Sequence, residues 1–393
     1  MSIRGKAFIV GAWEHPERDL PDTTVSQIEA QVGLGALEDA GLSLSDVDAL
    51  YCNAPGFGVI SQAEYMGLKL NVMDDTMTGG SAPIAHVGHA AAMIAAGKCQ
   101  VALITLGGRP RAAAREAAQG GGALQLGGRS DAPESGFEDP YGLSIPGIYA
   151  MAARRHMHEF GTTGEQLAEI KVAAAHHAQY NPNALRREPV SVEDVMNSPM
   201  VSDPLHRLDC CQITDGGGGL VVVSEEVARD LPRRAVKILG HGEAVKHADN
   251  GRIDLTYSGA RWSGPAAFAE AGVTPADMDC AMIYDSFTIT VLETLEDLGF
   301  CEKGKGGRFV LDGTLQAPHG ALPFNTDGGG LCNNHPGNRG GMTKVIEAVR
   351  QLRGEANPEV QVPNVQLALA HGTGGFLGSR MGSCTVILGQ EDS

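Results

Sequence analysis

Short apolar runs alternate along this chain with longer segments in which apolar residues recur every three or four positions. Runs of four to eight apolar residues are typical of buried strands, and the wider spacing is typical of helices with one buried face. The pattern predicts strands at 7–12, 48–52, 101–106, 220–224, 236–240, 280–284, 365–371 and 384–388. It predicts helices at 24–40, 82–96, 148–160, 165–179, 263–271, 288–298 and 340–352. Strands that alternate with helices favour a layered α/β fold.

One helix–turn–strand segment occurs twice. Gly41 in the first copy and Gly272 in the second stand 272 − 41 = 231 residues apart, and two alanines and two aspartates around them recur at the same offset. Each glycine is expected to end its helix in a left-handed cap. Because the two copies stand near the beginnings of two halves, we predict that the fold arose by duplication.

The segment between the halves differs in composition. It begins with a Gly/Ala-rich stretch at 112–128 and continues as helices with basic and histidine-rich patches. We therefore predict a first half at 1–108 and 206–235, an inserted loop domain at 109–205, and a second half at 236–393. The basic patches make the insert a plausible cover for an anionic ligand.

Composition narrows the function. The chain has 393 residues, of which 42% are apolar, and its net charge is 30 − 47 = −17. Such a charge repels nucleic acid, although a polyanionic cofactor can still bind a local basic patch. The eight cysteines form no CxxC pairs, so we expect reduced thiols and no metal. We expect a cytoplasmic protein without a membrane span, because no apolar run approaches about 18 residues.

Three segments combine glycine with side chains that can move a proton. Residues 328–341 place His335 in a loop of which six in fourteen residues are glycine. Tyr284-Asp-Ser-Phe287 and His371-Gly-Thr-Gly-Gly375 each follow an apolar run, where a strand is expected to end. Taken singly, each segment could be only a tight turn. Together they predict a site in which histidine or tyrosine transfers a proton near neutral pH.

These motifs, in two similar α/β halves, resemble those of the thiolase superfamily. The lipid-transfer-protein branch, similar to sterol-carrier-protein-type thiolases, is the closer match. The resemblance also rests on segments 146–155, 178–184 and 203–219, and it extends over nearly the whole chain. It implies a duplicated five-layered αβαβα fold with an inserted loop domain, and coenzyme A as the carrier of an acyl thioester substrate.

The resemblance also assigns the site. Thiolases carry a nucleophilic cysteine at the start of a buried helix, and that position falls here on Ser81, or on Gly80 with a shift of one residue. The chain has no cysteine between Cys52 and Cys99. A helix N-terminus favours a thiolate, but a serine hydroxyl needs an adjacent base. Cys332 is an alternative thiol, but it stands in the loop that carries His335 and not at the start of the helix.

The remaining site residues follow from the same motifs. His335 is implied to form an oxyanion hole and to shuttle protons, with Asn334 where relatives have glycine. Tyr284 is implied to donate a hydrogen bond or transfer a proton. His371 becomes the candidate base. The last residues expected at the site are backbone oxyanion donors around Gly374 and Gly375.

Three functions stay open on this sequence. The first is a CoA-thioester lyase of aldol or Claisen type without an acyl-cysteine, and the second is a thiolase-type acetyl-CoA acyltransferase. The third is a noncatalytic protein that binds acyl-CoA or lipid. We expect Arg154, Arg155 and Arg186 to contact CoA phosphates. The resemblance further implies a homodimer and a small partner protein with a zinc ribbon and an OB-fold.

Overall fold

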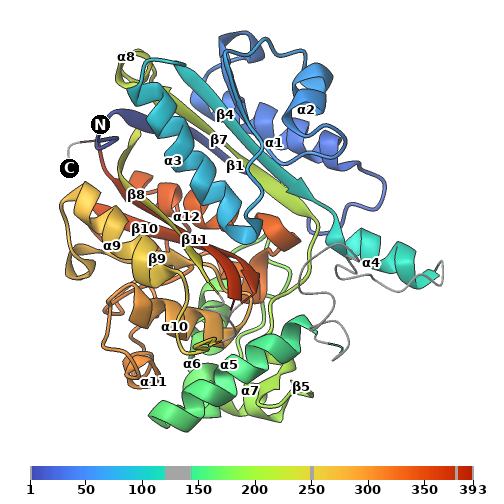
Figure 1. Ribbon diagram of the computed structural model, residues 1–393, viewed down its shortest axis with the longest axis vertical. Helices are drawn as coiled ribbons and strands as arrows, with labels where there is room; N and C mark the ends of the chain where they lie inside the picture. Colours follow the sequence, from blue (N-terminus) through green and yellow to red (C-terminus); the bar gives the residue numbers. More distant parts are fainter. Residues whose placement is uncertain (1, 120–141, 143, 248–251, 377–378, 392–393) are drawn as a thin grey trace.

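The computed structural model describes residues 2–119, 142, 144–247, 252–376 and 379–391 (Figure 1). Its main sheet has the strand order β3-β2-β4-β7-β1-β8-β11-β10-β9. These strands are β1 (Ala7–Glu14), β2 (Ala49–Tyr51), β3 (Val72–Asp74), β4 (Val101–Gly108), β7 (Gly216–Ser224), β8 (Val236–Lys246), β9 (Cys280–Ile283), β10 (Leu367–Phe376) and β11 (Ser379–Gly389). A separate pair consists of β5 (Met200–Ser202) and β6 (Leu205–His206).

The sheet consists of two similarly ordered halves that meet where β1 pairs with β8. Counted outward from that junction, the order is β1-β7-β4-β2 on one side and β8-β11-β10-β9 on the other. In each half the outer strands β2–β4 and β9–β10 are parallel, whereas β7 and β11 run antiparallel to their neighbours. The predicted duplicated α/β fold is confirmed.

The repeated segment has the same structure in both copies. Helix α1 (Val25–Ala40) ends at Gly41 with φ 74°, and helix α9 (Ala260–Ala271) ends at Gly272 with φ 68°. Asp48 accepts backbone N–H groups at the start of β4, and Asp279 accepts the corresponding N–H groups at the start of β10. The aspartates therefore occur in both halves because each joins a short strand to its neighbour.

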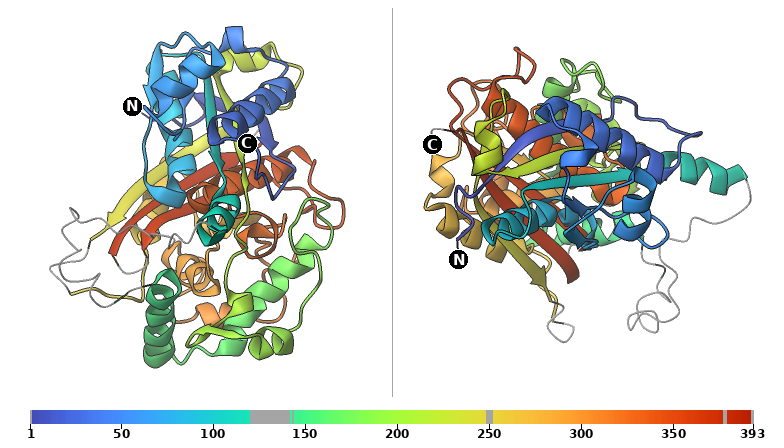
Figure 2. Two further views of the ribbon diagram at one scale, coloured as in Figure 1. Left: turned by 90° about the vertical axis from the view of Figure 1, so that its right-hand side faces the viewer. Right: turned by 90° about the horizontal axis from the view of Figure 1, so that it is seen from above.

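Helices form layers on and between the two halves of the sheet (Figures 1 and 2). Helices α3 (Ala82–Ala95) and α12 (Gly340–Arg353) lie in the middle, where Ile84 and Val345 share one core with Ile104 of β4 and Ala370 of β10. Helix α1 covers the outer face of the first half, together with α2 (Val59–Met66). Helices α9 and α10 (Thr288–Asp297) cover the outer face of the second half, which completes five layers.

The segment between the halves is helical, as predicted. It contains α4 (Pro110–Gln119), α5 (Ile145–Phe160), α6 (Gly164–Ala178) and α7 (Val192–Asn197). Helices α5 and α6 pack beside α10, where the Tyr149 ring stacks on Phe287 with 4.4 Å between ring centroids. The Gly/Ala-rich stretch continues beyond Gln119 outside the described residues, and the domain boundaries stay a prediction.

Strands β1, β4, β7, β8, β10 and β11 extend beyond their predicted ends, and the extensions of β7 and β10 bear on the site. Strand β7 begins at Gly216 because its glycines admit neighbouring backbone: a Cβ on Gly219 would lie 2.3 Å from the Val32 carbonyl oxygen. Strand β10 continues to Phe376, so the His371 motif lies inside a strand instead of following one. The short elements α2, β3, α8 (Glu225–Arg229) and α11 (Gly306–Phe309) were not predicted, because each is too short for a periodic signal.

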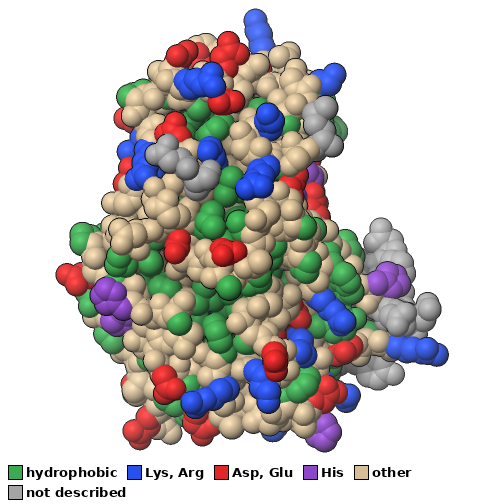
Figure 3. Space-filling model, turned by 90° about the vertical axis from the view of Figure 1, so that its left-hand side faces the viewer, with side chains coloured by type: hydrophobic (Ala, Val, Ile, Leu, Met, Phe, Trp, Pro, Cys, Tyr) green, Lys and Arg blue, Asp and Glu red, His purple; other side chains and the backbone are tan. Residues whose placement is uncertain are grey.

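Within the described ranges, no helix has the length and apolar character needed to cross a membrane. On the face drawn in Figure 3, acidic and basic side chains are interspersed over the upper and lower parts, with hydrophobic side chains between them. The net negative charge is therefore not gathered into one acidic patch on this face.

Candidate active site

Tyr284, His335 and Gly80 form the centre of the site. Tyr284 follows β9 directly, its ring meets His335 edge-on with 5.2 Å between centroids, and its hydroxyl donates to the Gly337 carbonyl at 3.3 Å. A Cβ on Gly80 would lie 2.4 Å from Tyr284 Cε2 and 2.4 Å from the Thr373 carbonyl oxygen. Position 80 therefore has no room for a side chain, because the tyrosine ring fills that space.

Ser81 is buried at the start of α3, but its hydroxyl is already engaged. Oγ donates to the Thr78 carbonyl at 2.8 Å and lies 3.0 Å from Thr78 Oγ1. None of its hydrogen-bond partners in the part of the chain that the structure describes is a histidine or a carboxylate that could remove its proton. A hydroxyl without such a base is a weak nucleophile.

His335 is held by its backbone and presents a free ring nitrogen. Its N–H donates to Thr214 Oγ1 at 2.9 Å, whereas Nε2 is buried and has no hydrogen-bond partner among the described residues. Burial lowers the pKa of His335 to about 4, against the opposing charge of Asp285. His335 is therefore neutral at pH 7, and its free nitrogen is available to a substrate.

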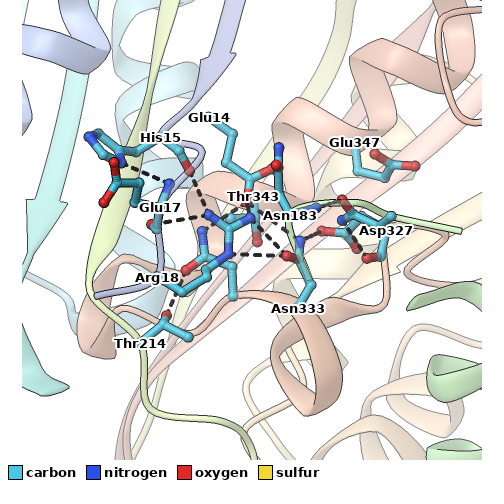
Figure 4. Close-up of polar contacts among 12 residues, drawn as sticks. Glu14, His15, Glu17, Arg18, Asn183, Thr214, Asp327, Asn333, Thr343 and Glu347 are labelled. Atoms are coloured by element: carbon cyan, nitrogen blue, oxygen red, sulfur yellow. Dashed lines mark hydrogen bonds and ion pairs between the residues drawn. The ribbon is translucent and has the colours of Figure 1, made fainter. Parts of the chain in front are cut away.

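Asn334 belongs to a buried polar network, part of which is drawn in Figure 4. Its Oδ1 accepts from Thr214 Oγ1 at 2.7 Å, and its Nδ2 donates to Glu14 Oε1 at 2.8 Å. Arg18 bridges Glu14 and Asn333, with both contacts at 2.8 Å. The Asn334 side chain thus fixes the loop, and it is not free for an oxyanion. Sequence reasoning missed Glu14 and Arg18, because their distance along the chain gives no signal of this contact.

An ion pair fixes the turn that precedes His335. Asp285 accepts the N–H groups of Gly330 at 2.8 Å and Leu331 at 3.0 Å, and it pairs with Lys344 of α12 at 2.8 Å. Burial alone would lower the pKa of Lys344, but Asp285 helps raise it above its ordinary value. Lys344 is therefore charged at neutral pH, and its contact with Asp285, the residue after Tyr284, holds the His335 loop in place.

His371 lies on the wrong face of the sheet for the predicted role as base. Its Nδ1 lies 2.8 Å from Thr385 Oγ1, which in turn contacts Ser263 of the outer helix α9. The residue that faces α3 is the next one, Gly372, whose Cβ would lie 3.0 Å from Ser81 Cα. Because alternate residues of a strand face opposite sides, the His371 ring points away from the Tyr284 ring, although the Tyr284 N–H donates to the His371 carbonyl at 3.0 Å. This placement corrects the assignment of His371.

Gly374 and Gly375 lie at the site through backbone contact. A Cβ on Gly79 would lie 2.8 Å from Gly374 Cα and 3.0 Å from Gly375 N. A Cβ on Gly374 itself would overlap the Thr78 carbonyl oxygen. Only glycine permits this approach, which brings the β10 end against the start of α3.

Cys332 is turned away from these groups. Its buried Sγ lies 3.0 Å from Lys171 Nζ on α6, and Lys171 also donates to the Leu331 carbonyl at 2.7 Å. Burial raises the pKa of the Cys332 thiol. A protonated thiol facing the loop domain does not replace the missing nucleophile.

The three arginines assigned to CoA stand in two places. Arg154 and Arg155 border a cavity of about 450 Å³ on α5 and form ion pairs with Asp203 and Glu159. Arg186 is exposed, and its backbone N–H donates to the Cys332 carbonyl at 2.9 Å, beside the His335 loop. The first pair lines a surface recess, and Arg186 stands nearer to the site.

Known proteins resemble this chain over nearly its whole length. Residues 242–390 match the family described as thiolase C-terminal domain-like. An acetyl-CoA acetyltransferase of Methanothermobacter thermautotrophicus is 33% identical over 381 residues, which cover 94% of this chain and 97% of that protein. A 17-hydroxy-3-oxo-4-pregnene-20-carboxyl-CoA lyase of Mycobacterium tuberculosis is 35% identical over 383 residues, which cover 94% and 97%. The solved structure of an Ltp2-ChsH2(DUF35) aldolase superposes with a TM-score of 0.87, at 33% identity, and 99% of each chain is covered.

Proposed function

From the premise that this chain belongs to the thiolase superfamily, in its sterol-carrier-protein-type branch, we propose that it is a CoA-thioester lyase that cleaves a carbon–carbon bond without an acyl-enzyme. Relatives that are lyases or aldolases by name support the reaction class. The observation that carries the proposal is the Tyr284 ring, which fills the space beside Gly80 where the resemblance permits a nucleophile.

The protonation states suit a retro-aldol reaction. Burial raises the pKa of Tyr284 well above its ordinary value, so its hydroxyl stays a hydrogen-bond donor at neutral pH. The lowered pKa of His335 keeps its ring neutral at pH 7, so the lone pair of the unpartnered Nε2 is free to accept a proton from the substrate. One group thus donates and the other accepts, which is the division that acid–base catalysis requires.

We assign the steps accordingly. His335 Nε2 takes the proton of a β-hydroxyl group, the Cα–Cβ bond breaks, and a carbonyl forms at Cβ. The electron pair passes into the thioester, whose enolate oxygen is held by the Tyr284 hydroxyl after it exchanges its 3.3 Å hydrogen bond to the Gly337 carbonyl for the substrate. Protonation of Cα then releases the shortened acyl-CoA.

The acyl carrier is coenzyme A, the group named in these relatives. We propose that Arg154 and Arg155 bind its phosphates at the α5 recess, and that Arg186 lies along the path toward His335. Their ion pairs with exposed carboxylates are weak and can exchange for phosphate.

We also propose two protein partners. Strand β3 is an edge of the sheet, and Met73, Met77 and Phe57 expose hydrophobic side chains there, at 61%, 54% and 84%. A second copy of the chain covering this edge would give a homodimer, which light scattering of the wild type and Met73→Asp would test. The solved aldolase assembly suggests in addition a DUF35 partner.

Acyl transfer is the second candidate function, because a 33% identical relative is an acetyltransferase by name. Transfer through an enzyme thioester would require a thiol at position 80 or 81. The space beside position 80 is filled by Tyr284, and Ser81 has no hydrogen bond to a base among the described residues. A noncatalytic acyl-CoA-binding protein is the third, and it would bind without turnover.

The decisive experiment is turnover of a β-hydroxyacyl-CoA panel by the wild type, with and without a co-encoded DUF35 protein. We expect release of an aldehyde or ketone together with a shortened acyl-CoA. Tyr284→Phe should lower kcat about 100-fold or more, the range for loss of one oxyanion donor. His335→Gln should lower it by a similar factor.

Tyr65→Phe and His319→Gln are matched controls, since both residues are exposed on the surface. They should leave turnover unchanged. Acetyl transfer without carbonyl release would replace the lyase by the acyltransferase, and binding without turnover would replace it by the carrier.

A further inference from the structure

Arg339 differs from the other partly buried arginines. Arg18, Arg109, Arg111, Arg233, Arg350 and Arg353 each form an ion pair with a carboxylate. Arg339 forms none with any carboxylate in the described ranges, and its buried Nε has no hydrogen-bond partner there. Its hydrogen bond goes from Nη2 to the Asn53 carbonyl at 3.3 Å. An arginine that is removed from water without a counter-charge is costly, which favours an anionic ligand.

The nearest charge interaction does not neutralise Arg339. Glu29 of α1 is fully buried, and burial raises its pKa to about 8, although Arg339 acts to lower it. A carboxyl group with that pKa is largely protonated at pH 7. Arg339 therefore carries a positive charge that no carboxylate of the described chain balances.

Arg339 is placed at the reacting groups. It is the residue before Gly340, the first residue of α12, and a Cβ on Gly340 would lie 3.0 Å from Tyr284 Cε2 and 3.5 Å from His335 Nε2. The Arg339 side chain crosses the end of β4, where its Cδ lies 3.3 Å from the Cβ position of Gly108. Its Nη2 then reaches the carbonyl of Asn53, two residues beyond the end of β2. The carboxyl ends of parallel strands are where ligands bind in such sheets.

Arginine suits one ligand class in this setting. Its planar guanidinium binds carboxylate through two parallel hydrogen bonds, and the N-terminus of the long helix α12 adds favourable potential for an anion. We propose that Arg339 binds a free carboxylate on the acyl group, so that the preferred substrates are acyl-CoA thioesters that carry a second carboxylate. This inference deepens the proposed function and rests on it for the position of the acyl group.

Equilibrium binding tests the inference without requiring turnover. The probes are three pairs of thioesters of equal carbon number: succinyl- and butyryl-CoA, glutaryl- and pentanoyl-CoA, and adipyl- and hexanoyl-CoA. The two members share the CoA moiety, so phosphate contacts cancel within a pair. We expect the wild type to bind the carboxylate member of at least one pair about 10- to 100-fold more tightly, as for a hydrogen-bonded charge.

Variants locate the effect. Arg339→Met should abolish the preference and leave binding of the methyl-ended member within about threefold, and Arg339→Lys should keep part of it. Arg308→Met removes the same charge from an exposed side chain and should change nothing. The inference is overturned if the wild type shows no preference in any pair, or if Arg339→Met weakens both members equally, which would assign Arg339 to the CoA phosphates or to folding.

Turnover separates this inference from the proposed reaction. If the protein is a lyase, it should cleave 3-hydroxyadipyl-CoA with a higher kcat/KM than 3-hydroxyhexanoyl-CoA. Arg339→Met should bring the two kcat/KM values together. If neither is cleaved but the binding preference depends on Arg339, the carboxylate site stands and the proposed reaction fails.

Discussion

At the scale of single residues, the chemistry that we propose depends on the Tyr284 ring, which occupies the space that a nucleophilic side chain at position 80 would need. A nucleophile at position 80 and a ring at Tyr284 exclude each other, because the Gly80 Cβ would lie 2.4 Å from Tyr284 Cε2. The neighbouring Ser81 donates its hydroxyl to Thr78. The reaction that we propose therefore uses the Tyr284 hydroxyl as hydrogen-bond donor and His335 Nε2 as proton acceptor.

Substitutions at the adjacent positions 80 and 81 should have very unequal effects. Gly80→Ala forces a methyl group into the Tyr284 ring and should destabilise the fold by about 1–3 kcal/mol, as for overpacking, and abolish turnover. Ser81→Ala removes one internal hydrogen bond, so turnover should stay within about tenfold of the wild type. Chemical denaturation and steady-state kinetics measure both.

The double variant Gly80→Ala/Tyr284→Ala removes the clash with the ring but keeps the 2.4 Å approach to the Thr373 carbonyl oxygen. It should therefore regain only the part of the lost stability that is due to the ring, and it should stay inactive. A large loss of turnover in Ser81→Ala, with stability unchanged, would contradict this prediction and indicate that Ser81 acts as a covalent nucleophile.

At the scale of elements, α12 and the turn at 329–333 position the site. The helix supplies Lys344, whose ammonium pairs with Asp285 at 2.8 Å, and Asp285 holds the N–H groups of Gly330 and Leu331. Both charges are buried, so their stabilising effect depends on their being together.

Removing one member of this ion pair should lower the free energy of unfolding more than removing both members. Lys344→Met leaves a buried aspartate unpaired and should destabilise the fold by about 3–5 kcal/mol. The double variant Lys344→Met/Asp285→Asn removes both charges and should be less destabilised than the sum of the single variants. A double-mutant cycle by urea denaturation measures the coupling, and additive effects would show that the pair does not act as a unit.

At the scale of the whole molecule, His89 of α3 joins the two halves of the sheet. Its Nδ1 lies 2.6 Å from Asp74 on β3, and its Nε2 lies 2.8 Å from Glu243 on β8. The hydrogen bond to Asp74, and then the one to Glu243, raise the pKa of His89 from 6.5 to about 10. The imidazolium thus bridges the edge of one half and the first strand of the other.

The sign of the pH effect follows from the raised pKa. The stabilisation is fully present below the ordinary value of 6.5, declines above it and is lost as the pH rises through about 10. His89→Gln should therefore lower the free energy of unfolding at pH 6 and much less at pH 10. The expected loss at pH 6 is only about 1–2 kcal/mol, because the partly exposed ion pairs are screened by solvent. Urea denaturation at the two pH values measures this, with His319→Gln as control. An equal loss at both pH values would contradict the bridge.

The predictable part of the fold is the part set by local pattern. The strands and helices around Val101, Thr288 and Gly340 were predicted to within a few residues, because their apolar spacing is a property of short segments. The repeat around Gly41 and Gly272 was visible because the same cap is needed twice. Short elements such as β3 give no such signal, and only their neighbours make them strands.

The sequence by itself determined the duplicated α/β fold and the glycine-rich loops, and it singled out Tyr284 and His335 as candidate proton-handling groups. It could do so because glycine, histidine and the period of apolar residues have local meanings. Tertiary structure alone decided which of these groups meet. A shift of one residue along β10 puts His371 on the outer face and Gly372 against Ser81. Folding also left Arg339 without a carboxylate partner among the described residues, since ion pairs between distant segments form only once the chain has folded.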